Sequence, residues 1–128
     1  MIAELQAATH RVVEHLAGEL RDLGLTPAEV NALARLRPAE PLAVADLVAA
    51  TGQRPSTLTG VIDRLEGRGL LARAVNARDR RSFVLELTPA GEAAARRVQA
   101  AIAELEAGVR ERVGERALAG FERVLREL

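Results

Sequence analysis

The chain of 128 residues has no cysteine, and His10 and His15 are its only histidines. The missing thiol excludes disulfide bonds, zinc–thiolate centres, iron–sulfur clusters and thiol redox sensors. The two histidines are five residues apart and so do not share one helix face, which argues against a metal pair. Either could line a ligand cleft by pairing with an acidic or phenolic group, although an exposed or interfacial histidine is the commoner case. We expect neither a metal nor another cofactor.

Lysine, tyrosine and tryptophan are absent as well, and Phe83 and Phe121 are the only aromatic residues. The core must therefore be aliphatic and rich in alanine, and such a composition favours helices because alanine loses least on entering one. No apolar run approaches the roughly 20 residues that cross a bilayer. The first residues carry charges of both signs and no signal-peptide pattern. We expect a cytoplasmic protein without membrane contact.

The net charge is zero, but the charges are unevenly spread. Seven arginines and three acidic residues lie between Gln53 and Ser82, whereas the rest of the chain holds 11 arginines and 15 acidic residues. A basic middle between acidic ends is typical of a domain that offers one face to phosphate. The remaining carboxylates are scattered, with no glycine-rich loop and no nucleophile–base pair, so no enzymatic activity is expected.

Hydrophobic periodicity predicts four helices in the first half of the chain. The first runs from Ala3 to Leu23, and a capping box over Thr26–Glu29 opens the second, which reaches about Arg37. A short helix from Val44 to Ala50 and a helix from Pro55 to Arg68 follow, separated by a tight glycine-containing turn. Two helices joined in this way predict a helix-turn-helix.

Two β-compatible runs follow the fourth helix, Leu70–Val75 and Ser82–Leu87, with the charged loop Asn76–Arg81 between them. A hairpin directly after a helix-turn-helix is a wing. Asp79 can fix the guanidinium of Arg81 two residues later, and narrow minor grooves attract arginine.

Two further helices are predicted after Thr88-Pro89, with a break at Gly114. The terminal helices carry apolar stripes with little nearby to cover them, and a two-fold dimer would bury these stripes. We therefore predict a mainly α fold with a small β hairpin (α+β), a winged helix-turn-helix flanked by dimerisation helices. The expected division is an N-terminal dimerisation helix over 1–24, the DNA-binding domain over 25–88 and C-terminal dimerisation helices over 89–128.

Five segments in this order resemble the MarR family of bacterial transcriptional regulators. They are LTPAE (25–29), ADL (45–47), STLTGVIDRLEGRGLLAR (56–73), DRRS (79–82) and LTPAG (87–91). The resemblance implies a homodimer that binds a pseudo-palindromic operator in double-stranded DNA. Such proteins are most often repressors, released by a small phenolic or otherwise lipophilic effector.

The family's DNA contacts fall on the start of the fourth helix and on the wing. Ser56, Thr57 and Thr59 would meet base edges and phosphates, and Arg64 the backbone. Arg81 would enter the minor groove, with Asp79 holding it in place. The predicted DNA-binding set is completed by further arginines of the basic segment, namely Arg54, Arg78 and Arg80.

Three features depart from the family pattern. Arg54 stands where a capping aspartate or serine is usual, Gly60 stands where many members carry a basic residue, and the chain is short. Net neutrality and Gly60 leave open a winged helix that serves only protein–protein contact or dimerisation. The scarcity of aromatic residues leaves open a DNA binder that senses no ligand.

Overall fold

The computed structural model describes all residues from Met1 to Leu128. The elements follow the order α1 (Ile2–Glu19), η1 (Arg21–Leu23), α2 (Pro27–Leu33), β1 (Leu42–Ala43), α3 (Val44–Thr51), α4 (Pro55–Gly67), β2 (Leu71–Val75), β3 (Phe83–Leu87), α5 (Pro89–Val113) and α6 (Glu115–Arg126). This order confirms the predicted mainly helical α+β class. None of the helices has the length and apolar character that a membrane span requires.

The first two helices are shorter than the sequence predicted. Leu20 leaves the α conformation at φ −108° and ψ 17°, and the chain continues as the 3₁₀ turn η1. The apolar spacing runs on through this turn, so periodicity alone did not reveal the break. Helix α2 begins with the predicted capping box, but it ends at Leu33 instead of Arg37.

The hairpin is confirmed and belongs to a three-stranded antiparallel sheet in the order β1-β3-β2. Leu71 pairs with Leu87 and Val75 with Phe83 along the hairpin. Strand β1 was not predicted, because two residues are too few to show an alternating pattern. It pairs with the middle of β3 and so ties the hairpin to the start of α3.

The core is aliphatic, as the composition requires. The apolar residues of α4 that face the core are buried, and they are Leu58, Val61, Ile62 and Leu65. Leu16 and Leu20 from the first helical segment and Val98 from α5 join the same cluster. The terminal helices are therefore covered in part within one chain, unlike the uncovered apolar stripes expected from the sequence.

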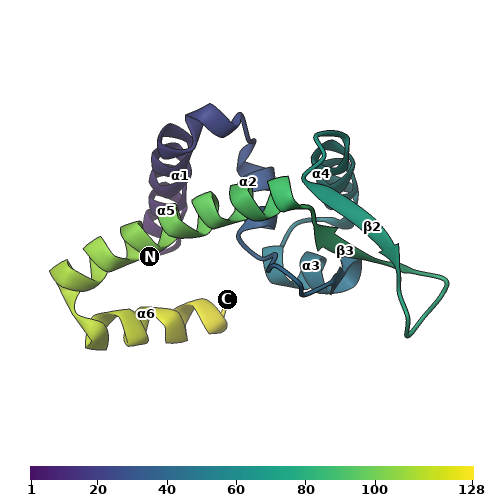
Figure 1. Ribbon diagram of the computed structural model, residues 1–128. Helices are drawn as coiled ribbons and strands as arrows, with labels where there is room; N and C mark the ends of the chain where they lie inside the picture. The colour runs from purple at the N-terminus through teal and green to yellow at the C-terminus, as the bar shows by residue number, and fades with distance from the viewer.

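The first turn of α5 lies against the backbone that leads into β2. A Cβ atom on Gly91 would stand 1.8 Å from the carbonyl oxygen of Leu70, so only glycine allows this approach. Figure 1 shows the result: the hairpin projects beyond one end of α5, and α6 folds back at the other end. Helix α6 contains no buried residue.

Candidate nucleic-acid interface

The N-terminus of α4 is exposed and has no side-chain cap. Arg54 occupies the N-cap position and makes no capping hydrogen bond, as its side chain predicts. The first backbone bond of the helix runs from Leu58 N–H to Arg54 O. The amides of Ser56 and Thr57 therefore have no helical acceptor, and such free first-turn amides can bind a phosphate.

The three predicted hydroxyl contacts differ in what they can offer. Ser56 is exposed at the first turn. The hydroxyl of Thr59 donates to Pro55 O at 3.0 Å, so its oxygen remains only as an acceptor, suited to a base amine and not to a phosphate. Thr57 is exposed and borders a cavity between α1, α2 and α5.

Arg64 is held by Glu29, the carboxylate that also caps α2. Glu29 is 3% exposed, and its Oε2 accepts from Thr26 N–H at 3.1 Å. Its Oε1 accepts from Arg64 Nε at 3.0 Å, while the Arg64 side chain stays 53% exposed. Glu29 and Arg64 lie 35 residues apart in the chain, on two different helices. Sequence periodicity therefore could not predict that they pair.

Two other arginines near the hairpin base have structural partners. The two terminal nitrogens of Arg68 donate to Leu23 O at 2.6 Å and to Gly24 O at 3.3 Å. Arg73 pairs with Asp63 at 2.7 Å and with Glu66, and the hydrogen bond with Asp63 raises the pKa of Arg73. These contacts join α4 to its neighbours, so both arginines have a structural role.

The wing tip differs from the prediction in one contact. Asp79 Oδ1 accepts from the backbone N–H of Arg81 at 3.0 Å, so Asp79 shapes the turn and does not hold the Arg81 guanidinium. An aspartate favours this local bond to the backbone two residues on. Arg78, Arg80 and Arg81 are all exposed, and none pairs with an acidic residue of the chain. The projecting hairpin thus presents unpaired positive charge.

A cavity of about 810 Å³ lies near this surface, between α1, α2 and α5. It is bordered by 19 residues, ten of them hydrophobic. Neither His10 nor His15 is among them, and both are exposed. Thr9, Val12 and Val13 line the cavity from α1 instead. The structure therefore does not bring the histidines to a ligand cleft within the chain.

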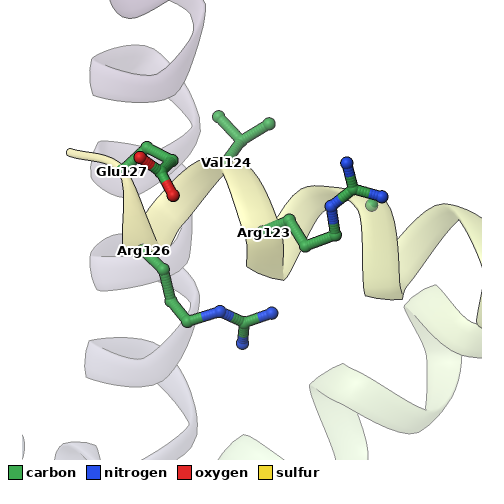
Figure 2. Close-up of a pocket in the computed structure, with 5 residues that line it drawn as sticks. Arg123, Val124, Arg126 and Glu127 are labelled. Atoms are coloured by element: carbon green, nitrogen blue, oxygen red, sulfur yellow. The ribbon is translucent and has the colours of Figure 1, made fainter.

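A second hollow of about 380 Å³ lies along α6. Four of its five lining residues belong to this one helix and the fifth, Glu127, is its C-cap. Figure 2 shows Val124 and Arg126 leaving the helix on opposite sides. No second element closes this hollow.

The sequence and the fold are similar to those of known proteins. A family model described as the MarR family matches residues 23–82. The HTH-type transcriptional repressor MdtR of Bacillus subtilis (strain 168) is 34% identical over 88 residues, covering 69% of this chain and 57% of that protein. The chain thus matches little more than half the length of this curated relative.

Two solved structures cover nearly the whole chain. BpsR of Bordetella bronchiseptica, whose DNA binding is described as regulated by 6-hydroxynicotinic acid, has a TM-score of 0.79 and 28% identity, with 98% of this chain and 95% of that chain covered. The transcriptional repressor CouR bound to a 23-mer DNA duplex has a TM-score of 0.77 and 28% identity, with 97% and 88% covered. The comparisons therefore identify residues 23–82 with the MarR family, and the fold of known transcriptional regulators extends over nearly the whole chain.

Proposed function

We propose that this protein is a cytoplasmic DNA-binding repressor that acts as a homodimer on a pseudo-palindromic operator. The observation that carries the proposal is the projecting hairpin tip, whose exposed Arg78, Arg80 and Arg81 have no acidic partner. Unpaired arginines at such a tip fit the negative potential of a minor groove. The likeness to a repressor solved on a DNA duplex supports the same reading.

In this proposal α4 enters the major groove with its N-terminus toward a phosphate. The free amides of Ser56 and Thr57 bind that phosphate, and the Arg64 guanidinium contacts the backbone. Gly60 lacks the basic side chain common in the family, but Arg64 supplies the charge there. Its Nη1 lies 3.3 Å from the point where a Cβ of residue 60 would stand.

A homodimer accounts for the large surface of the single chain. The accessible area is 8688 Å², whereas a compact protein of 13.7 kDa exposes about 6,600 Å². Part of the excess is apolar, since Phe121, Val124 and Leu125 of α6 are 40–49% exposed. We assign the segments 1–24 and 89–128 to dimerisation and 25–88 to DNA binding.

The cavity beside α4 supports a ligand-responsive repressor. Its volume lies within the range of about 300–1,000 Å³ that holds small molecules, and it touches both the flanking helices and Thr57. A ligand weakens operator binding only if it prefers a spacing of the two α4 helices that does not fit DNA. The described regulation of BpsR by a small aromatic acid is a precedent in a similar fold.

The proposal can be tested by selecting bound duplexes from a random library and measuring their affinity by fluorescence anisotropy across a salt series. We expect inverted repeats to be enriched and affinity to fall steeply with salt, because several phosphates are contacted. Arg81→Ala should weaken binding by about tenfold. Arg116→Ala in α6 removes the same charge at the other end of the molecule and should change little.

Either of two results would contradict the proposal. One is a selection that enriches no sequence. The other is equal affinity for the Arg81→Ala and Arg116→Ala variants. If dimers stay intact in such a case, the winged helix serves protein–protein contact without an operator.

A further inference from the structure

The guanidinium of Arg73, a residue of β2, lies where β2, β3 and α4 meet. It donates to Asp63 Oδ1 of α4 at 2.7 Å and to Glu66 Oε1 of the same helix. It also lies 5.0 Å from the centre of the Phe83 ring of β3, within the range of a cation–π contact. One planar group thus joins two carboxylates of α4 and the aromatic ring of the hairpin.

Few other polar contacts hold the hairpin in its direction. Arg73 is the only residue of β2 that forms a hydrogen bond or an ion pair with α4. At the other edge of the hairpin, β1 pairs with β3 at only two residues, Val84 and Leu85. The hairpin tip, residues 76–82, forms hydrogen bonds only within itself. The polar ties of the tip to the rest of the chain are therefore a two-residue strand on one side and Arg73 on the other.

The apolar packing of the hairpin also ends at Arg73. Alternate residues of a strand point to one face, so Leu71, Arg73 and Val75 share the side of β2 that faces the core. Leu71 is buried there, and so is Leu85, which lies opposite Arg73 in the sheet. The next pair toward the tip, Val75 and Phe83, is exposed. The core thus supports the hairpin up to Arg73 and not beyond it.

We propose that Arg73 is a positioning residue, which fixes the direction of the hairpin relative to α4 so that the tip reaches the minor groove beside the major groove that α4 enters. The inference rests on the proposed function, in which α4 and the hairpin tip bind DNA. It adds the residue that couples these two contacts. The preference for bases at the flank of the operator then depends on a side chain that need not touch DNA.

The two carboxylates give this role a signature that charge alone does not give. Asp63 and Glu66 are exposed on the helix proposed to enter the major groove, where negative charge repels phosphate. If they acted on DNA only through their charge, removing both charges would tighten binding to every duplex. If they hold Arg73, removing both charges releases the hairpin and abolishes the contribution of its tip to base preference.

The first test measures the direction of the hairpin without DNA. Because the chain has no cysteine, spin labels attach only at introduced cysteines, here Gly67→Cys at the end of α4 and Ala77→Cys in the tip, both exposed. Double electron–electron resonance on dimers with one labelled chain then gives a single intrachain distance distribution. We expect it to be narrow with Arg73 present and to broaden in Arg73→Gln and in Asp63→Asn/Glu66→Gln. A distribution that stays narrow in both variants would overturn the inference.

The second test measures base preference by fluorescence anisotropy on selected duplexes whose flanking pairs are A·T, G·C or inosine·C. Guanine places an amino group in the minor groove, which adenine and inosine lack there. The wild type should bind the A·T and inosine·C flanks at least about fivefold more tightly than the G·C flank. In Arg73→Gln and in Asp63→Asn/Glu66→Gln this preference should disappear, while selectivity for the bases that α4 reads remains.

Two comparisons separate positioning from other effects. A general loss of folded protein would lower the preference for flank and core bases together, whereas a misdirected hairpin lowers only the first. The control Asp46→Asn/Glu86→Gln removes the same two charges from exposed positions that form no ion pair. It should leave both the distance distribution and the flank preference unchanged.

Tighter binding of Asp63→Asn/Glu66→Gln to all duplexes, with its flank preference intact, would overturn the inference in favour of charge alone. A wild type without flank preference would overturn it too, even where operator binding itself stands. If the selection enriches no sequence, the proposed function fails and the reading of the flank fails with it. The distance measurement, which uses no DNA, then separately confirms or overturns the role of Arg73 in directing the hairpin.

Discussion

At the scale of single residues, Glu29 joins α2 to α4, the helix that we propose enters the major groove. One oxygen caps α2 and the other holds Arg64 of α4, and the carboxylate is buried between them. Glu29→Gln retains an oxygen for the cap but loses the charge that pairs with Arg64. We expect the free energy of unfolding in urea to fall by about 1–3 kcal/mol, the range for a hydrogen bond to a charged group.

Operator affinity should fall in the same variant, because Arg64 is no longer held beside Gly60. Glu86→Gln removes the same charge from an exposed position of β3 and should change stability by no more than about 0.5 kcal/mol. Equal stability of these two variants would show that the Glu29–Arg64 pair does not hold α4 in place.

Asp22 gives the protein a defined acid dependence. The hydrogen bond from Arg97 lowers the pKa of Asp22 in the folded state. A carboxyl with a lowered folded pKa adds stability above its unfolded pKa of about 4, and that contribution is lost as the pH falls through the folded value.

Asp22→Asn should therefore lower Tm at neutral pH and narrow its difference from the wild type as the pH falls below about 4. Thermal melts across that range check this, with Glu104→Gln, an exposed position without an ion pair, as the control. A Tm difference that stays constant with pH would mean that the Asp22 charge contributes nothing.

At the scale of elements, the contact between α5 and the start of β2 depends on one missing methyl group. Gly91→Ala would place Cβ against the Leu70 carbonyl, and backbone cannot yield as a flexible side chain can. We expect a loss of at least about 1–3 kcal/mol in the free energy of unfolding by urea.

Gly18→Ala is the matched control, because a Cβ there meets nothing within 4 Å. It lies inside α1, so alanine should stabilise the protein by about 0.5–1 kcal/mol. If Gly91→Ala lowers the free energy of unfolding and Gly18→Ala raises it, the loss at Gly91 comes from the close approach to Leu70 and not from helix propensity. A Gly91→Ala variant that is more stable than the wild type would contradict this account of the contact.

The boundaries of the helices show how far the sequence could predict this fold. The capping threonines Thr26 and Thr88 mark where α2 and α5 begin, because such caps act over three residues. The end of α2 is different, because Gln99 of α5 donates to the carbonyls of Leu33 and Leu36 there. These partners lie more than 60 residues apart in the chain, so the local sequence around Leu33 could not predict where α2 ends. Among site residues, the wing arginines were predictable from the sequence, whereas the Arg64–Glu29 pair required the folded chain.

At the scale of the whole molecule, the elements proposed for DNA binding and those proposed for dimerisation lie at opposite ends of α5. The hairpin and α4 lie at one end and α6 at the other (Figure 1). In the proposed homodimer, the pairing of α5 and α6 between chains would therefore set the distance between the two copies of α4. The exposed side chains of α6 that would make this pairing are apolar on one side of the helix. Dimerisation and operator affinity should therefore be lost together.

Phe121→Glu tests this link, because it places a charge in the middle of the apolar face of α6. We expect sedimentation to show a monomer that keeps its helical circular dichroism, since α6 contributes no buried residue to the core of the chain. Operator affinity should then drop to that of a single half-site. Ala119→Glu adds the same charge on the opposite, polar side and should leave the dimer intact. If Phe121→Glu remains a dimer with full operator affinity, the two copies meet elsewhere, and the apolar face of α6 has another use.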